Sequence, residues 1–548
     1  MKFRFILLPL LVLFIFTGWA ATVYTQANSD RVEGEASIKK VFQTILDRYV
    51  AEIDPEKLAD AAIEGMLKEL DPYSQHIDDN NSYRLDAITT GEYGGVGIHL
   101  GRMNDSLMVI SPMDGTPAFL QGILAGDRIV KIDSVWTKKL SLDEAARMVR
   151  GEKGSTINLL IKREGETDYL NFELIREFIK VPDVSYSGLL RERTGYVKLS
   201  NFSKYSAEEL EKAIRKINNI GLEALIIDVR GNPGGLLSAA LMSADLFIEQ
   251  GATLLETRGR IKQSNKTYLS RRRPIVRDNL PIAILIDGGS ASASEILAGI
   301  LQDYDRAVVI GEPSFGKGLV QTVTRLTPDT RLKLTSAKYY LPSGRLIQKR
   351  EIAEDVMYED LLISQDTSYL SDNNRKFEGG GGVEPDIYTE DFPLGNLEKS
   401  LWRQRLFFKY ALKYGGEHPG LNMPINFEDA EVDSFYAWMK DHDLIPETKL
   451  KLRINDLDDA LDTTSAIYSD ILDLQQSLSL MEEIYAQEEF YKIKFQLLAG
   501  LEMEMARVLA GNGARISASL THDRVVLKAI EVLASDSQVQ EILAGPTE

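Results

Sequence analysis

The stretch Gly289-Ser290-Ala291-Ser292-Ala293-Ser294-Glu295 follows the apolar run Ile282–Ile286 and precedes an apolar pattern at helical spacing that begins at Ile296. A short apolar run of this kind predicts a buried strand, and the spacing after it predicts a helix. A serine between the two lies at the helix N-terminus, where free N–H groups and the positive end of the helix dipole can stabilise an oxyanion. The segment therefore suits a nucleophilic serine.

A nucleophilic serine needs a base, and the histidines cannot supply one here. No histidine lies between residues 100 and 417, which excludes a Ser-His-Asp triad within this segment. The remaining candidate is Lys317, in the loop Phe315-Gly316-Lys317-Gly318. A lysine that is removed from water loses its charge more readily than an exposed one. Phe315, Leu319 and Val320 are expected to form the apolar walls that this requires.

A simpler interpretation competes with this one. Ser292 and Glu295 fit the S-x-x-E capping box, in which both residues only start a helix. Lys317 taken alone is typical of a solvated surface lysine. The upstream sequence favours the catalytic interpretation: a branched run, Ala224–Val229, leads into Arg230-Gly231-Asn232-Pro233-Gly234-Gly235. A glycine-rich turn at a strand end can present bare backbone N–H groups to a ligand.

Four motifs in this order carry a resemblance to a known family. They are RGNPGGLL from Arg230, GGSASASEI from Gly288, FGKGLVQ from Phe315 and GGVEPDI from Gly381. Together they resemble the S41 family of carboxyl-terminal processing peptidases, also called tail-specific proteases, over the range 35–387.

The resemblance implies a role for each matching residue. Ser292 is the expected nucleophile, Lys317 the general base, and Gln321 a residue that helps to position the lysine. The backbone N–H groups of Gly235 and Ala293 are the expected oxyanion hole. Glu295 matches an accessory acidic position, for which helix capping remains an equally good account. Only the resemblance selects Ser292 over its neighbours Ser290 and Ser294.

The expected fold class is an α+β multidomain chain with a mixed α/β peptidase core of the S41, crotonase-like type. Two apolar stripes at helical spacing predict an N-terminal helical region over 35–87, which resembles a region that supports dimers in some family members. The catalytic domain is expected over 183–391 and a helical C-terminal domain over 392–548. At 548 residues with 44% hydrophobic content, the chain can form about three or four domains.

The range 88–178 resembles a PDZ domain. Short β-like runs occur at 107–110, 128–132 and 157–161, with a helical stretch at 142–149. Gly95, Val96, Gly97 and Ile98 match the loop that binds a terminal carboxylate. Consecutive N–H groups there can hold a free C-terminus while the peptide adds a strand to the sheet edge.

The N-terminus predicts export from the cytoplasm. Lys2 and Arg4 precede an uncharged apolar run, Phe5–Phe16, so residues 1–27 are expected to form a signal peptide or an uncleaved membrane anchor. The body of the protein is then expected on the periplasmic side of the cell envelope, either anchored in the inner membrane or released. The chain has no cysteine, which excludes disulfides, thiolate metal sites and a lipoprotein anchor. Its net charge of −19 argues against nucleic acid as a partner.

These features predict a serine endopeptidase that uses a Ser-Lys dyad to cleave envelope proteins or peptides after its PDZ domain has bound their C-terminal tails. No metal or other cofactor is expected. The expected partners are proteins or peptides with free C-termini, with an adaptor and a second copy of the chain left open. The alternative is a catalytically silent peptide- or ligand-binding scaffold of the same fold.

Overall fold

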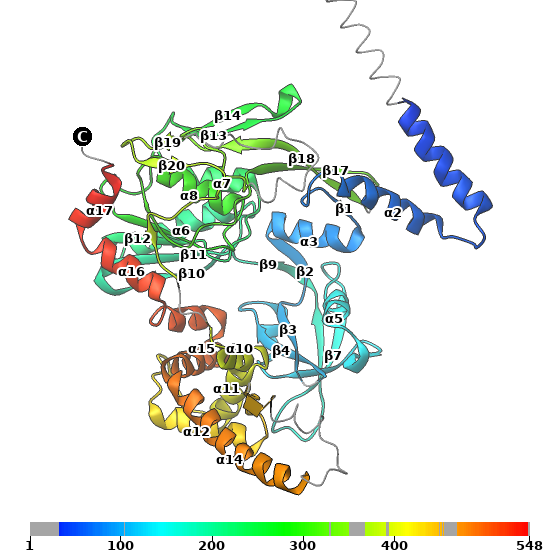
Figure 1. Ribbon diagram of the computed structural model, residues 1–548, viewed down its shortest axis with the longest axis vertical. Helices are drawn as coiled ribbons and strands as arrows, with labels where there is room; N and C mark the ends of the chain where they lie inside the picture. The colour runs from blue at the N-terminus through cyan, green and yellow to red at the C-terminus, as the bar shows by residue number, and fades with distance from the viewer. Residues whose placement is uncertain are drawn as a thin grey trace, which may run out of the picture. The chain divides into compact units, whose positions relative to one another are not determined.

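The computed structural model describes residues 32–103, 105–327, 330–349, 368–390, 394–448, 450–451, 453 and 468–545 (Figure 1). The predicted signal peptide or anchor, 1–27, lies outside these residues. The chain divides into two compact units. The first contains the described residues up to Asp79 and the segment Gln321–Thr335; the second contains those of Asn80–Val320, Ser336–Ala353 and Leu362–Glu548.

The first unit is built from helices and one short strand. A helix covers 32–48, α2 spans Pro55–Lys68, and β1 (Gln75–Ile77) pairs antiparallel with Arg331–Lys333 of β18 (Arg331–Tyr340). Asp71 closes the turn after α2 by accepting hydrogen bonds from the backbone N–H groups of Tyr73 and Ser74. Several apolar side chains of the first helix are exposed, among them Ile38 at 54% and Val41 at 58%.

The helices of the described residues give no candidate for a membrane span, because none combines the necessary length and hydropathy.

The second unit begins with α3 (Asp79–Thr90), whose first residue belongs to the other unit, and continues into the PDZ-like part. Its sheet has the order β3-β4-β5-β7-β8, with β6 paired to β5, and β2 pairs antiparallel with β9. The strands are β2 (Glu92–Gly95), β3 (Ile98–Met103), β4 (Ser106–Pro112), β5 (Arg128–Ile132), β6 (Val135–Trp136), β7 (Thr156–Lys162), β8 (Leu170–Ile175) and β9 (Glu177–Lys180). The helices are α4 (Pro117–Leu120), a 3-10 turn at Thr137–Lys139, and α5 (Leu142–Val149).

The catalytic part is a six-stranded sheet in the order β10-β11-β12-β15-β16-β21, parallel except for the antiparallel pair β10–β11. The strands are β10 (Val184–Leu189), β11 (Thr194–Leu199), β12 (Ala224–Asp228), β15 (Ile282–Ile286), β16 (Val308–Gly311) and β21 (Ile387–Tyr388). Strands buried on both faces read as continuous apolar runs, which is why β12 and β15 are recognisable in the sequence.

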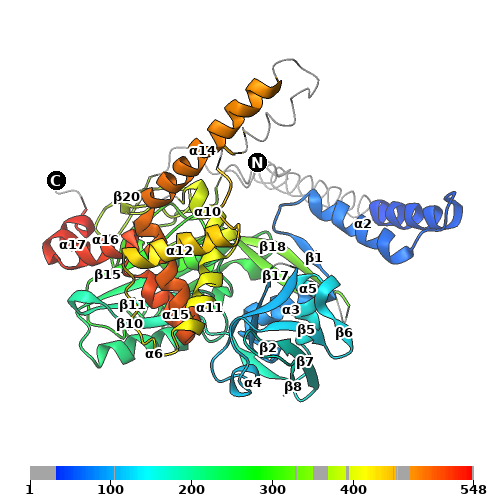
Figure 2. The same cartoon turned by 90° about the horizontal axis from the view of Figure 1, so that it is seen from below.

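Each face of this sheet packs against helices. Along β12, Leu225 and Ile227 belong to the core formed with α6 (Ser206–Asn218), α7 (Leu237–Ala244) and α8 (Ala293–Asp303). Ala224 and Ile226 point to the other face, which is covered by α16 (Arg524–Leu533) and α17 (Asp536–Leu543) (Figures 1 and 2). The last two helices of the chain therefore complete the core of the peptidase sheet.

Smaller strands surround this sheet. β13 (Thr253–Arg258) pairs antiparallel with β14 (Lys266–Leu269) and with Lys338–Tyr340 of β18. Further elements are 3-10 turns at Arg191–Arg193 and Lys262–Ser264, β17 (Leu319–Arg325), and the hairpin of β19 (Ser368–Leu370) with β20 (Lys376–Glu378).

The C-terminal region is helical, as expected. Its helices before α16 are α10 (Asn396–Arg403), α11 (Leu406–Glu417), α12 (Asp429–Asp441), α14 (Tyr468–Lys492) and α15 (Lys494–Ser519). An aromatic core that includes Phe407, Phe435 and Phe490 holds them together. The predicted α+β multidomain fold with a helical C-terminal region is confirmed.

Candidate active site

The three serines between β15 and α8 have different environments. Ser290 and Ser294 are fully buried, and their hydroxyls donate hydrogen bonds to backbone carbonyls of the segment that runs from Val229 into the glycine-rich loop. Ser290 Oγ bonds Val229 O at 2.9 Å, and Ser294 Oγ bonds Asn232 O at 2.8 Å. Ser292 is half-buried, and within the described residues its hydroxyl donates no hydrogen bond to the glycine-rich loop. The geometry thus gives a physical reason to prefer Ser292 over Ser290 and Ser294 as the nucleophile, whereas the sequence alone gives none.

The backbone of Ser292 adopts an unusual conformation, with φ 54° and ψ −108°, directly before α8 begins at Ala293. A positive φ is costly for a residue with a side chain, and such residues cluster at functional sites where the surroundings impose the conformation. This sharp strand-to-helix turn exposes Ser292 between two buried neighbours.

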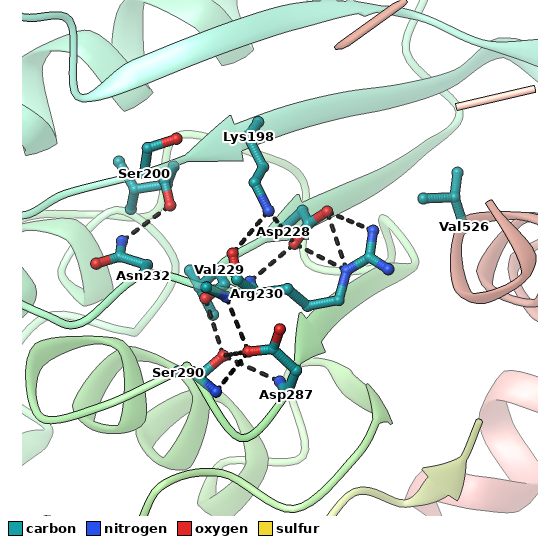
Figure 3. Close-up of polar contacts among 12 residues, drawn as sticks. Lys198, Ser200, Asp228, Val229, Arg230, Asn232, Asp287, Ser290 and Val526 are labelled. Carbon is teal, nitrogen blue, oxygen red and sulfur yellow. Dashed lines mark hydrogen bonds and ion pairs between the residues drawn. The ribbon is translucent and has the colours of Figure 1, made fainter. Parts of the chain in front are cut away.

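The two loops that follow β12 and β15 are joined by several hydrogen bonds (Figure 3). Asp287 Oδ1 accepts from the backbone N–H groups of Gly231 at 2.8 Å and Gly289 at 2.9 Å. The Ala291 N–H donates to Asn232 O at 3.1 Å. These bonds fix the glycine-rich loop against the serine segment.

The two expected oxyanion donors lie on these joined loops. Gly234 packs so closely on the serine segment that an added Cβ would lie 3.0 Å from Ser292 Cβ and 3.0 Å from the Ala293 nitrogen; its φ of 99° also favours glycine. Within the described residues, the N–H groups of Gly235 and Ala293 donate no hydrogen bond. Two uncommitted N–H groups flanking a serine can bind an oxyanion.

Glu295 joins the serine segment to the lysine loop. This carboxylate is fully buried and accepts four hydrogen bonds. Oε2 accepts from the backbone N–H groups of Ser292 at 2.7 Å and Lys317 at 2.9 Å. Oε1 accepts from Ser314 Oγ at 2.5 Å and from the Gly316 N–H at 2.7 Å. Burial raises the pKa of Glu295 to about 7, against the opposing effect of these hydrogen bonds. Glu295 therefore does more than start a helix.

Lys317 lies half-buried in a loop that glycine makes possible. Gly316 has φ 88°, and an added Cβ would lie 2.3 Å from Lys349 Cγ. The hydroxyl of the buried Tyr339 donates to Lys317 O at 2.5 Å and lies 3.4 Å from Ser292 O, which is a second link between the two segments. Leu319 is buried as expected, whereas Phe315 is 38% exposed, and its role as an apolar wall beside the lysine stays a prediction.

The late GGVEPD motif contacts the same network, which sequence reasoning missed. The N–H of the buried Val383 donates to Ser314 Oγ at 2.7 Å, and Ser314 in turn donates to Glu295. The sequence indicated only a loop leading to a last strand, because the residues of the motif do not show which distant residue they contact. The fold thus connects all four motifs.

Gln321 lies in β17 and belongs to the first unit, where its side-chain amide donates to Tyr73 O at 2.9 Å. Its assignment as a residue that positions Lys317 remains a prediction.

The four residues of the expected carboxylate-binding loop connect β2 to β3. Val96, Gly97 and Ile98 line a cavity of about 330 Å³ together with residues of α5, and Gly95 ends β2. Arg150, which follows α5, lines the same cavity and stacks on the ring of Tyr93 at 6.0 Å. No sequence motif identifies Arg150 as a cavity residue, because its position depends on how α5 packs on the sheet.

The described residues contain no group of three or more His, Asp or Glu side chains arranged to hold a metal ion.

Comparison with known families gives matches to four separate parts of the chain. Residues 193–358 match the model of Peptidase family S41, and residues 108–163 match that of a PDZ domain. Residues 397–533 match the C-terminal helical domain of a probable PDZ-protease, and residues 20–81 match the N-terminal domain of the activating protease CtpB.

Individual relatives agree with these matches. A carboxy-terminal-processing protease of Bartonella bacilliformis is 39% identical over 347 residues, which cover 63% of this chain and 79% of the relative. A probable CtpA-like serine protease of Staphylococcus aureus is 34% identical over 332 residues, covering 60% of this chain and 65% of the relative. A solved structure of a photosystem II D1 C-terminal processing protease has 24% identity and a TM-score of 0.35, covering 64% of this chain and 86% of that one. On the family matches and the 39% identity to the Bartonella bacilliformis protease, this chain belongs to the S41 peptidase family and is a carboxy-terminal-processing serine protease with a PDZ domain.

Proposed function

We propose that this peptidase cleaves proteins or peptides near their C-termini by a Ser-Lys mechanism, with Ser292 as nucleophile and Lys317 as general base. The observation that carries the proposal is the bridge through Glu295, whose Oε2 accepts hydrogen bonds from the backbone of both residues. A buried carboxylate that holds two loops in register is an expected feature of a site that must fix a nucleophile relative to its base.

In the proposed reaction, the neutral Lys317 amine takes the proton of the Ser292 hydroxyl as Oγ bonds to the scissile carbonyl carbon. The carbonyl oxygen becomes an oxyanion that accepts hydrogen bonds from the N–H groups of Gly235 and Ala293. The protonated lysine then gives its proton to the leaving amine as the C–N bond breaks. Water, activated by the same amine, releases the acyl group from Ser292. Gln321 is assigned to holding the lysine amine in place.

The PDZ cavity supplies the substrate specificity in this scheme. A terminal carboxylate is proposed to bind the N–H groups of the loop formed by Gly95, Val96, Gly97 and Ile98. The Arg150 guanidinium in the same cavity supports the assignment, because a charge-assisted hydrogen bond to a carboxylate is stronger than a neutral one. The peptide would then extend the sheet at β3.

The cleavage assay for this proposal uses a peptide that ends in a free carboxylate, with the wild type and Ser292→Ala. Cleavage by the wild type and none by Ser292→Ala is expected. If the wild type binds the peptide in the PDZ cavity but leaves it intact, the chain is a scaffold and the proposed reaction is wrong.

The proposed location is the periplasmic side of the cell envelope, with residues 1–27 as signal or anchor. Protease added to intact spheroplasts should digest the body of the protein. Protection until the spheroplasts are lysed would place the body in the cytoplasm.

A second copy of the chain is proposed as a partner through the apolar face of helix 32–48, where Ile38 and Val41 are exposed. An adaptor is a further proposed partner.

A further inference from the structure

A buried cluster of charges lies at the end of β12, where the active-site loop begins (Figure 3). Asp228 has no exposed surface and accepts hydrogen bonds from Tyr196 Oη at 2.7 Å, Lys198 Nζ at 3.0 Å and Arg230 Nη2 at 2.7 Å. Burial alone would raise the pKa of Asp228, but the charges of Arg230 and Lys198 hold it well below its usual range. Asp228 is therefore an anion that needs both cations.

Arg230 is held in this cluster by its backbone as well as its side chain. Its N–H donates to Asp228 Oδ1 at 2.9 Å, and its carbonyl accepts from Lys198 Nζ at 2.8 Å. The guanidinium reaches a second carboxylate on the far side: Nη2 bonds Asp523 Oδ2 at 2.6 Å and Nη1 bonds Asp523 Oδ1 at 3.1 Å. Such a two-point pair fixes orientation as well as distance.

Arg230 is also the first residue of the loop that carries the proposed oxyanion donor. The next residue, Gly231, donates to Asp287, and Gly235 follows four residues later. Because the Arg230 N–H and carbonyl are also bonded within the cluster, a displacement of the cluster shifts the start of the segment that must place the Gly235 N–H.

Asp523 comes from the C-terminal helical region, outside the residues 193–358 that match the S41 model. It is the N-cap of α16 and accepts a hydrogen bond from the Val526 N–H at 3.0 Å. α16 packs on the peptidase sheet through buried residues that include Val526 and Val525. With Asp523 present, two anions balance the two cations; without it, the cluster keeps one uncompensated positive charge.

We infer that Asp523 is a positioning residue for the active-site loop, contributed by the helical C-terminal region through Arg230. This role rests on the proposed function of Gly235. Asp523 touches no substrate atom; it fixes the Arg230 guanidinium, and Arg230 fixes the entry of the loop. A purely structural alternative is that the pair only anchors α16 to the sheet, in which case its loss reduces stability and leaves turnover by the folded enzyme unchanged.

The test is Asp523→Asn in the full chain, because asparagine caps a helix about as well as aspartate and so removes the charge while keeping the cap. The control is Val526→Ala, which weakens the packing of the same helix without touching the charge cluster. Both are measured for kcat, KM and unfolding temperature with a peptide substrate. Ser292→Ala is measured in parallel, so that failure of the proposed function itself is recognised by its retained activity.

We expect Asp523→Asn to lower kcat about 10- to 100-fold with KM within about twofold of the wild type, because small displacements of positioning groups have effects of this size. Val526→Ala should lower the unfolding temperature by about 2 °C or more and leave kcat unchanged. Wild-type kcat in Asp523→Asn, with Ser292→Ala inactive, would overturn the inference. If Asp523→Asn does not fold, Asp523→Ser replaces it, because serine also caps a helix and carries no charge; a kcat loss no larger than that of Val526→Ala then overturns the inference.

Discussion

The side chain of Glu295 accepts a hydrogen bond at 2.7 Å from the backbone nitrogen of Ser292, three residues before it. The same oxygen accepts a second one at 2.9 Å from the backbone nitrogen of Lys317. A single buried atom thus sets the spacing between the segments that carry the proposed nucleophile and its base.

Replacing Ser292 by glycine should abolish cleavage and stabilise the protein. Glycine removes the hydroxyl and also relieves the positive φ of 54°, which costs a residue with a side chain about 1–3 kcal/mol. Thermal unfolding should therefore occur at a temperature equal to or above that of the wild type. Ser294→Ala is the contrasting variant: it should reduce stability by about 0.5–1.5 kcal/mol, because one buried hydrogen bond is lost while Asn232 O keeps the Ala291 N–H as a donor, and it should retain activity. Retained activity in Ser292→Gly would exclude Ser292 as nucleophile.

Replacing Lys317 by arginine should abolish cleavage as completely as replacing it by alanine, because a guanidinium stays charged and cannot accept a proton. Lys349→Arg is the matched control, since the Lys349 side chain lies beside Gly316 in the same loop and has no assigned role in the chemistry. Steady-state kinetics on the three variants test this, and appreciable turnover by Lys317→Arg would disprove the base assignment. Because only the neutral amine is a base, wild-type activity should rise with pH.

Replacing Glu295 by glutamine should lower kcat about 10- to 100-fold. All four partners of the carboxylate are donors, so the amide group of glutamine leaves at least one buried donor unpaired, at a cost of about 1–3 kcal/mol. Protonation of Glu295 in the wild type has the same effect on the network. With its pKa raised to about 7, wild-type kcat should fall as the pH drops through 7, and Glu295→Gln should lack that step. If kcat of Glu295→Gln still falls as the pH drops through 7, the fall is caused by the titration of another group.

The Glu295 carboxyl affects stability in the opposite direction from kcat as the pH changes. Burial raises the pKa of Glu295 above its ordinary value of 4.5, so between that value and about 7 the folded state binds more protons than the unfolded state. Its contribution to the free energy of unfolding is therefore largest below pH 4.5 and is lost as the pH rises through 7. Urea unfolding at pH 5 and pH 8 should show that Glu295→Gln destabilises the protein more at pH 5.

Amidating the C-terminus of a substrate should raise KM about tenfold or more and leave kcat nearly unchanged, because the charge-assisted hydrogen bonds in the PDZ cavity are lost. In Arg150→Ala the difference between free-acid and amidated peptides should shrink. Arg147→Ala is the control, because Arg147 lies exposed on α5 and does not line the cavity. Equal cleavage of both peptides by the wild type would show that the terminal carboxylate is not recognised.

Much of the fold can be read from the sequence because its strongest signals are local. The apolar runs predicted β12 and β15, and the expected strand 128–132 and helix 142–149 coincide with β5 and α5. Contacts between distant segments carry no such signal. The expected helical domain over 392–548 contains α16, but nothing in the sequence says that the apolar face of this helix covers the peptidase sheet. In the same way, S-x-x-E predicts a helix start at Ser292, while the bonds from Glu295 to Ser314 and Lys317 depend on how the loops fold together.

The most direct test of the Ser292–Lys317 assignment is labelling with a fluorophosphonate, followed by mass spectrometry of the digested protein. The probe forms a covalent bond with an activated serine. The position of the adduct therefore identifies the nucleophile, and the rate of labelling depends on the base that activates it. The account predicts one adduct, on Ser292, and loss of labelling in Lys317→Ala while the fold is retained. An adduct on another serine, or equal labelling of Lys317→Ala, would contradict it.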